Sequence, residues 1–309
     1  MTLAPEAKAY LEEQDAMWRA AGPNLTPAQV REIAGRDSGS GGVVSTDVDI
    51  HHDYFVSPTA YIPVVVFTPK NSVGLKPALV FYHGGGWTNN TIMKYAPQMS
   101  AMAAEGDLVV VGVNYQKAPE HKFPIPFDDC YAGLEWVLKN AERFGIDPTA
   151  IGVGGDSAGG NLAACVAIKA RDTGLVNLAF QALIYPTTSF ELEKKSVNDH
   201  ATGFGLSKEA LHFFWRGYCS PEHDSNPYSL PSNERNLAGV ASAIIGLAEH
   251  DVLRDDGMDY GEQLKAAGVN VVLKEYPGMI HGFFSNSEKL PAGKALRLWL
   301  VEEINKLCR

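Results

Sequence analysis

The chain alternates short apolar runs with longer segments of helical pattern. Eight runs are typical of strands, near 43–51, 60–68, 77–82, 107–114, 150–155, 180–186, 242–250 and 270–276. The first two leave no room for a helix between them, so we expect them to pair antiparallel. From the third run onward the gaps carry helical patterns such as FDDCYAGLEWVLKNAERFG, and runs such as ALVFY and LVVVGV are almost entirely apolar. This order predicts an α/β fold with a mostly parallel sheet covered by helices on both faces.

One connection, residues 187–241, is far longer than a crossover needs and contains no clear strand. Connections of this length are often functional. We interpret it as a helical cap inserted over one end of the sheet. The alternative is a peripheral excursion whose aromatic residues pack into the main core. The aromatic residues in question are Phe213, Phe214, Trp215 and Tyr218.

The N-terminal segment, residues 1–40, also lies outside the strand pattern. Its first half has helical composition, and Thr26-Pro27-Ala28-Gln29 has the form of a capping box that begins a second helix, which we expect Gly35 to end. We therefore expect 1–40 to form the N-terminal part of the cap. Residues 41–186 and 242–309 would form the main domain.

Composition excludes several classes of protein. The net charge is −10 and the charges are dispersed, so nucleic-acid binding has no electrostatic support. No run of about eighteen apolar residues exists, so no membrane span is expected. The start, MTLAPEAKAYLEEQ, lacks the pattern of a signal peptide, and the four cysteines are far apart. We therefore expect a cytoplasmic protein with reduced thiols.

The stretch GGDSAGGN, residues 154–161, lies between an apolar run and a helical pattern. Its glycines have two explanations: they only allow a buried turn to pack tightly, or they hold Ser157 in a cramped, reactive position. The sequence GDSAG matches the G-x-S-x-G elbow, in which a serine sits at a strand-to-helix turn. The helix that follows would place its positive N-terminal end near any negative charge that develops at the serine.

A second glycine-rich stretch, HGGGW at residues 83–87, directly follows the third apolar run. Glycines leave backbone N–H groups uncovered, and acyl transfer needs such donors around its oxyanion. The alternatives are a phosphate-cradling loop or a plain turn. A P-loop is excluded because no Gly-Lys-Ser/Thr follows.

A serine nucleophile needs a base that a carboxylate orients, and with this elbow the chain order is serine, acid, histidine. Asp251 comes just past the seventh run, with Glu249 and Asp255 as rivals. Asp255 or Asp256 would instead cap the next helix. His281 comes after the eighth run and follows both Ser157 and Asp251. His250 precedes Asp251 directly and is expected to point the other way.

These stretches together resemble the hormone-sensitive-lipase family of α/β-hydrolases, in its GDSAG carboxylesterase branch. Matching stretches span about residues 77–284 and include HGGGW, NYQKAPEHKFPIPFDDCYAGLEWV, GDSAGGNLAA, LIYP, AEHDVLRDDG and HGF. The resemblance implies an α/β-hydrolase fold with a helical cap. It implies Ser157 as nucleophile, Asp251 as acid and His281 as base. The remaining roles that it implies are an oxyanion hole from the N–H groups of Gly85, Gly86 and Ala158, and loop bracing by His83 and Asp156.

The resemblance also bears on substrate and partners. It implies hydrolysis of short- to medium-chain acyl esters with no cofactor, and no His, Cys and Glu cluster has the spacing of a metal site. A homodimer is left open. The chain departs from the family at Gln116-Lys117, where Arg-Leu is usual, which puts a bracing ion pair near the active site in doubt.

Two other functions remain open at this point. The same machinery could cleave an amide, such as an arylformamide, or a lactone, because attack and oxyanion stabilisation are shared. A non-catalytic small-molecule receptor on the same fold is the third alternative. A receptor is expected to lack a member of the triad, whereas Ser157, Asp251 and His281 are all present.

Overall fold

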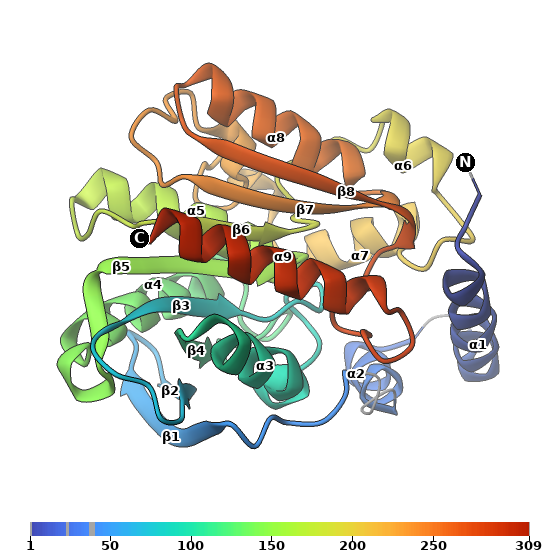
Figure 1. The fold of residues 1–309 in the computed structure, drawn as a ribbon. Helices are drawn as coiled ribbons and strands as arrows, with labels where there is room; N and C mark the ends of the chain where they lie inside the picture. Colours follow the sequence, from blue (N-terminus) through green and yellow to red (C-terminus); the bar gives the residue numbers. More distant parts are fainter. Residues whose placement is uncertain (1, 23–24, 37–40, 309) are drawn as a thin grey trace.

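The computed structural model describes residues 2–22, 25–36 and 41–308, and an eight-stranded sheet forms its centre (Figure 1). The strand order is β1-β2-β4-β3-β5-β6-β7-β8. β1 pairs antiparallel with β2 and β2 antiparallel with β4, while the other neighbours are parallel. The predicted mostly parallel sheet with an antiparallel first pair is confirmed. The strands are β1 Val48–Val56, β2 Tyr61–Pro69, β3 Lys76–Tyr82, β4 Val109–Val113, β5 Ile146–Asp156, β6 Gln181–Ile184, β7 Ala243–His250 and β8 Val271–Ile280.

Helices cover both faces of the sheet, as expected for apolar parallel strands. Three of them, α4 (Ile125–Lys139), α5 (Ala158–Thr173) and α8 (Arg254–Ala266), bury side chains in one hydrophobic core. On the opposite face α3 (Ala96–Gly106) and α9 (Ala292–Leu307) contribute to a second core.

The two cores are separated by the period-2 alternation of the strands. Val64 and Val66 of β2 belong to the core under α4 and α5, whereas Val65 and Phe67 belong to the core under α3 and α9. Successive side chains of a strand point to opposite faces, so a run that is apolar throughout fills both cores. This explains why the central strands are the clearest feature of the sequence.

The first strand is the exception, because the prediction over 43–51 was wrong. β1 begins at Val48 and continues to Val56, and Val43 lies in a loop with 91% of its surface exposed. β1 is an edge strand in which only Val48 and Phe55 are buried, and polar residues are mixed with the apolar ones along it. Its position is set by pairing with β2, where Val48 lies opposite Pro69 and Val56 opposite Tyr61.

The N-terminal segment forms α1 (Pro5–Ala21) and α2 (Pro27–Arg36). The predicted capping box is present before α2: the N–H of Thr26 donates to Gln29 Oε1 at 2.9 Å, and the N–H of Gln29 donates to Thr26 Oγ1 at 3.4 Å. The expected end at Gly35 was wrong by one residue, since α2 continues through Gly35 to Arg36. Residues 23–24 and 37–40 of this segment lie outside the described residues.

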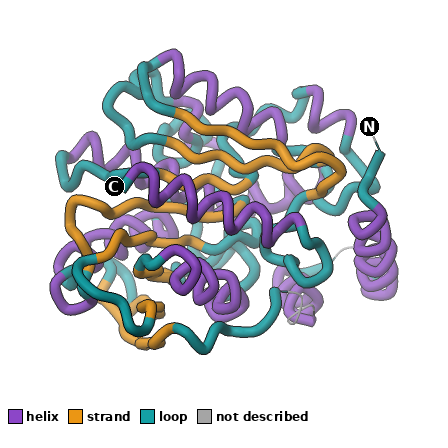
Figure 2. The backbone as a smooth tube through the Cα atoms, in the orientation of Figure 1, coloured by secondary structure: helices purple, strands orange, loops and turns teal. Residues whose placement is uncertain are grey.

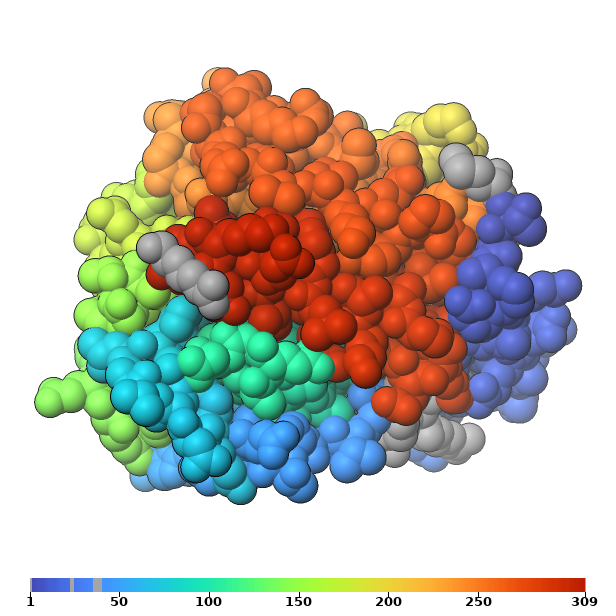
Figure 3. Space-filling model, in the orientation of Figure 1, coloured from blue at the N-terminus to red at the C-terminus, as the bar shows by residue number. Residues whose placement is uncertain are grey.

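Residues 187–241 contain no strand and form α6 (Lys195–Asp199), α7 (Lys208–Tyr218) and two short 3₁₀ turns, Pro221–His223 and Pro231–Asn233. Figure 1 shows α1, α2, α6 and α7 gathered beyond the carboxyl ends of the parallel strands. Figure 2 shows that loops connect these helices to the sheet. In Figure 3 the N-terminal helices form the right-hand end of the molecule, against residues near position 290. There Lys289 Nζ pairs with Glu13 Oε1 at 2.7 Å.

The aromatic residues of α7 divide between two environments. Trp215 and Tyr218 are fully buried in the main core, where Trp87 stacks on Tyr218 at 4.5 Å and meets Trp215 edge-on at 5.5 Å. Phe213 is 40% exposed. One side of α7 therefore belongs to the core and the other does not.

Within the described residues, no helix is both long and apolar enough to cross a bilayer. In the same residues no three His, Cys, Asp or Glu side chains gather where they could hold a metal ion. Cys130, Cys165, Cys219 and Cys308 are all free thiols.

Candidate active site

Ser157 sits at the turn between β5 and α5 with backbone angles of φ 54° and ψ −120°. A positive φ is strained for any residue but glycine. A Cβ on Gly155 would lie 2.3 Å from the Tyr82 carbonyl oxygen, and a Cβ on Gly159 would lie 2.0 Å from it. The flanking glycines thus permit tight packing and the strained serine together, because the elbow is pressed against the end of β3.

The side chains of Ser157, His281 and Asp251 form one hydrogen-bonded series. His281 Nε2 lies 2.9 Å from Ser157 Oγ, and His281 Nδ1 lies 2.7 Å from Asp251 Oδ2. Asp251 follows β7 and His281 follows β8, so parallel pairing of these strands brings both to the edge of the sheet where Ser157 lies. Asp251 is 1% exposed, and its Oδ1 also accepts the N–H of Leu253 at 2.9 Å. One carboxylate oxygen is therefore left to orient the imidazole.

The rival carboxylates have other partners. Glu249 Oε2 accepts the N–H of Gly278 at 2.7 Å, and Asp255 Oδ2 accepts the N–H of Ser196 at 2.8 Å. The expectation that Asp255 or Asp256 caps α8 was wrong, since Leu253 occupies the N-cap and both aspartates lie in the first turn. They instead anchor the 187–241 segment, and Asp256 accepts hydrogen bonds from the hydroxyl of Ser189 and the N–H groups of Thr188 and Ser189.

His250 lies away from the Ser157 series. Its ring stacks on Phe204 at 5.4 Å and meets His200 edge-on at 5.4 Å. Neither of its ring nitrogens has a hydrogen-bond partner among the described residues. It is therefore packed against the 187–241 segment.

The glycine loop after β3 presents backbone donors to the same place. Gly85 and Gly86 have φ of 118° and 58°, a region that favours glycine. The N–H groups of Gly85, Gly86 and Ala158 donate no hydrogen bond to another described residue. Ala158 is the first residue of α5, whose N–H has no partner within the helix. An oxyanion needs backbone donors that no other group occupies.

Asp156 joins the elbow to the glycine loop. Its Oδ1 accepts the N–H of Gly84 at 2.7 Å, and its Oδ2 accepts the hydroxyl of Tyr95 at 2.9 Å. Burial raises the pKa of Asp156 to about 6, although both hydrogen bonds favour the ionised form. His83 lies behind the loop, where its ring stacks on Tyr115 at 4.4 Å and burial holds its pKa well below the usual value.

Gln116 and Lys117 replace the family's Arg-Leu without an ion pair. Gln116 donates to Asp129 from its backbone N–H at 2.9 Å and from Nε2 at 3.1 Å. Burial raises the pKa of Asp129. Lys117 Nζ donates to Asn114 Oδ1 at 3.2 Å and to the Tyr115 carbonyl at 3.0 Å. Hydrogen bonds rather than an ion pair therefore brace this loop.

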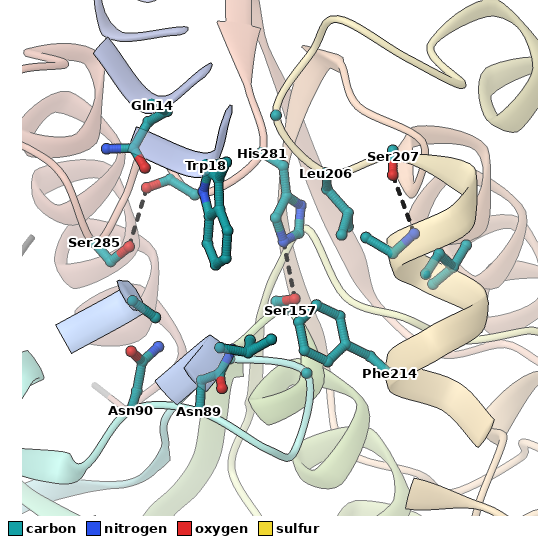
Figure 4. Close-up of a pocket in the computed structure, with 18 of the residues that line it drawn as sticks. Gln14, Trp18, Asn89, Asn90, Ser157, Leu206, Ser207, Phe214, His281 and Ser285 are labelled. Atoms are coloured by element: carbon teal, nitrogen blue, oxygen red, sulfur yellow. Dashed lines mark hydrogen bonds between the residues drawn. The ribbon is translucent and has the colours of Figure 1, made fainter. Parts of the chain in front are cut away.

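A cavity of about 810 Å³ opens onto Ser157 and is lined by α1, α2, α7 and the loops that carry Gly86 and His281. Figure 4 shows Trp18 and Asn89 on one side of the Ser157–His281 pair, with Leu206 and Phe214 on the other. A Cβ on Gly86 would lie 2.4 Å from Phe214 Cγ, so the Phe214 ring packs directly on the glycine loop.

Sequence reasoning missed Tyr185, which contacts His281. The ring centroids of Tyr185 and His281 are 4.7 Å apart, and Tyr185 is fully buried with a positive φ of 34°. The stretch LIYP contains this residue, but nothing in its spacing indicates a contact with a histidine almost one hundred positions away.

Comparisons with known proteins agree with this geometry. A family described by the alpha/beta hydrolase fold matches residues 79–285. Carboxylesterase NlhH of Mycobacterium tuberculosis is 41% identical over 235 residues, 75% of this chain and 74% of that protein. Arylacetamide deacetylase of Oryctolagus cuniculus is 31% identical over 290 residues, 72% of this chain and 73% of that protein. A solved ester hydrolase from the metagenome of Lake Arreo, complexed with a bipyridine phosphonate derivative, superposes with a TM-score of 0.94 at 32% identity and covers 99% of both chains.

Proposed function

We propose that this protein cleaves short- to medium-chain acyl esters by way of an acyl-enzyme. The chain belongs to the hormone-sensitive-lipase-like carboxylesterase branch of the α/β hydrolases and is thus a carboxylic ester hydrolase. One observation carries the proposal: His281 bridges Ser157 Oγ at 2.9 Å and Asp251 Oδ2 at 2.7 Å. This is the arrangement that serine hydrolases use to activate a hydroxyl.

In the first half of the reaction, Ser157 Oγ attacks the ester carbonyl carbon and its proton passes to His281 Nε2. Asp251 stabilises the resulting imidazolium. The negative charge on the former carbonyl oxygen is met by the N–H groups of Gly85, Gly86 and Ala158. The intermediate collapses as the bond to the alcohol oxygen breaks, and His281 returns the proton to that leaving oxygen.

In the second half, a water molecule gives a proton to His281 Nε2 and attacks the acyl carbon. The bond to Ser157 Oγ then breaks, the proton returns to this oxygen, and the carboxylic acid leaves. Asp156 supports both halves by holding the Gly84 backbone at 2.7 Å, which keeps the glycine loop at a fixed distance from the serine. His83 packs behind the same loop.

We assign residues 1–40 and 187–241 to a cap over a catalytic domain of residues 41–186 and 242–309. Contacts that tie the cap to this domain support the assignment. Arg31 of α2 pairs with Glu120 at 2.5 Å and donates to the carbonyl of Ala118 at 2.7 Å. A closed cap excludes water and strengthens the electrostatic effect of the backbone donors.

The cavity also limits the size of the substrate. Each buried methylene adds about 0.8 kcal/mol of favourable transfer, but only while space remains. Trp18 and Phe214 lie on opposite sides of the Ser157–His281 pair in this cavity, and we assign to them the limit on chain length near the reacting carbon.

Amide hydrolysis is a second candidate. The likeness to an arylacetamide deacetylase favours it, since an amide substrate needs the same nucleophile and the same oxyanion donors. Comparing p-nitrophenyl butyrate with an arylacetamide and a lactone separates the three substrate classes, and turnover of none would favour a receptor. The homodimer that the sequence left open is tested by light scattering.

The decisive experiment measures p-nitrophenyl butyrate turnover for Ser157→Ala and His281→Ala. Each variant should lose several orders of magnitude in kcat, because members of a triad act as a unit. Ser285→Ala is the matched control, since Ser285 lines the same cavity outside the triad. A serine-directed organophosphate should label Ser157 stoichiometrically. Near-normal turnover by Ser157→Ala would contradict the proposal.

A further inference from the structure

Asn89 lines the catalytic cavity, yet its side-chain amide forms no hydrogen bond with any residue that the structure describes. The residue is 6% exposed, and its Oδ1 is fully buried without a partner. Leaving a buried amide unpaired is costly, and each such group calls for an explanation. Oδ1 is enclosed by protein, so the end of this amide that a molecule entering the cavity can reach is Nδ2, a hydrogen-bond donor that is not among the fully buried atoms.

The position of this amide relative to the reacting carbon is fixed by the backbone. The N–H of Asn89 donates to the Gly85 carbonyl at 2.8 Å. A Cβ on Gly85 would lie 2.7 Å from the Asn89 carbonyl oxygen, so the two backbones are in close contact. Asn89 thus moves with the glycine loop that presents the oxyanion donors.

The neighbouring asparagine has a different role. Asn90 has a positive φ of 67°, and its Nδ2 donates to the Gly84 carbonyl at 3.2 Å, so its amide holds the loop itself. The loop is therefore braced by Asn90 and by Asp156, and does not depend on the Asn89 side chain. This separates a substrate contact at Asn89 from a structural one.

The two sides of the cavity differ in chemistry. Figure 4 shows Asn89, Asn90 and Gln14 on one side of Ser157, with Leu206 and Phe214 on the other. A substrate that fills both sides would carry an apolar group toward Phe214 and a hydrogen-bonding group toward Asn89. A substrate with a purely apolar group on the Asn89 side would leave the amide unpaired. A site of this kind discriminates strongly against the substrate analogue that lacks the hydrogen-bonding group.

We propose that Asn89 hydrogen-bonds a hydroxyl or carbonyl group of the substrate, so that the preferred esters carry such a group close to the ester bond. This inference rests on the proposed esterase function. The group belongs either to the alcohol or to the acyl part of the ester, and the two arms of the experiment distinguish these sources. Without such a contact an apolar cavity favours the unsubstituted ester, because a hydroxyl loses its hydration on entering.

The test compares two matched pairs of esters by titrating the released acid. The alcohol arm pairs glyceryl 1-monobutyrate with propyl butyrate, and the acyl arm pairs methyl 3-hydroxybutyrate with methyl butyrate. Each ratio of kcat/KM is divided by the ratio of alkaline hydrolysis rates, which removes intrinsic reactivity. We expect the hydroxylated ester to be preferred about tenfold in one arm.

Two variants locate the source of the preference. Asn89→Leu keeps the volume but removes the amide, and should bring the ratio to one or below. Leu206→Ala, on the opposite side of the cavity, should change kcat/KM for both esters of a pair by the same factor, so that their ratio stays as in the parent protein. p-Nitrophenyl butyrate, which carries no hydroxyl, reports whether each variant still has a working catalytic site.

Three results would overturn the inference: no preference in either arm, a preference that survives in Asn89→Leu, or loss of p-nitrophenyl butyrate turnover in both Asn89→Leu and Asn89→Ala. The last would show that Asn89 supports the loop. Failure of the parent protein to hydrolyse p-nitrophenyl butyrate at all would instead refute the esterase function on which the inference depends.

Discussion

Replacing Lys117 by leucine, the residue usual at this position in the family, should stabilise the protein at neutral pH. Lys117 Nζ donates only to the neutral oxygens of Asn114 and Tyr115, and among the described residues no carboxylate lies within ion-pair distance. Burial, aided by the positive charge of Arg31, lowers the pKa of Lys117 from 10.5 to about 8. The folded state therefore disfavours the charged amine.

The size and sign of the effect follow from proton linkage. A base whose pKa is lower in the folded state costs stability as the pH falls from about 10.5 to about 8, and the full cost persists below. For this shift the cost is about 3 kcal/mol at pH 7 and about 1 kcal/mol at pH 9.5. Lys117→Leu should thus gain about 2 kcal/mol more over the parent at pH 7 than at pH 9.5.

Urea unfolding followed by tryptophan fluorescence measures this difference at both pH values. Lys139→Leu, at an exposed position in the last turn of α4, is the matched control and should show no such dependence on pH. A stability difference between Lys117→Leu and the parent that is equal at both pH values, or larger at pH 9.5, would refute the reasoning about burial.

Asp251→Asn should lower kcat by about 10⁴-fold, because His281 loses its orienting anion, whereas Glu249→Gln should keep most of the p-nitrophenyl butyrate turnover; the reverse order would contradict the assignment of the acid. Gly159→Ala should destabilise the fold by about 3 kcal/mol in thermal unfolding, since its Cβ would lie 2.0 Å from the Tyr82 carbonyl, and an unchanged Tm would contradict the packing of the elbow. Across a p-nitrophenyl ester series kcat/KM should rise over the first few carbons and then fall, and removing residues 1–40 should broaden the profile or abolish activity; identical profiles would contradict a role for this segment in the cavity.

The sequence by itself determined those features that depend on neighbouring residues. A strand, a turn with small residues and a helix are specified within some twenty positions, so the elbow at Ser157 and the glycine loop at 83–87 are readable from local spacing. The central strands are equally readable, because burial on both faces makes them apolar throughout. The positions of Asp251 and His281 at the ends of two such strands then place both side chains at one edge of the sheet.

Tertiary structure decided whatever depends on a distant partner. The edge strand β1 takes its position from pairing with β2, and so its own sequence, in which polar and apolar residues are mixed, did not locate it. Trp215 and Phe214 are adjacent on α7, yet one is fully buried beside Trp87 and the other lines the cavity, a division that only the packing of the helix sets. The unpaired amide of Asn89 was also decided by tertiary structure. The sequence shows only that an asparagine is present, whereas its lack of a partner depends on every segment folded around it.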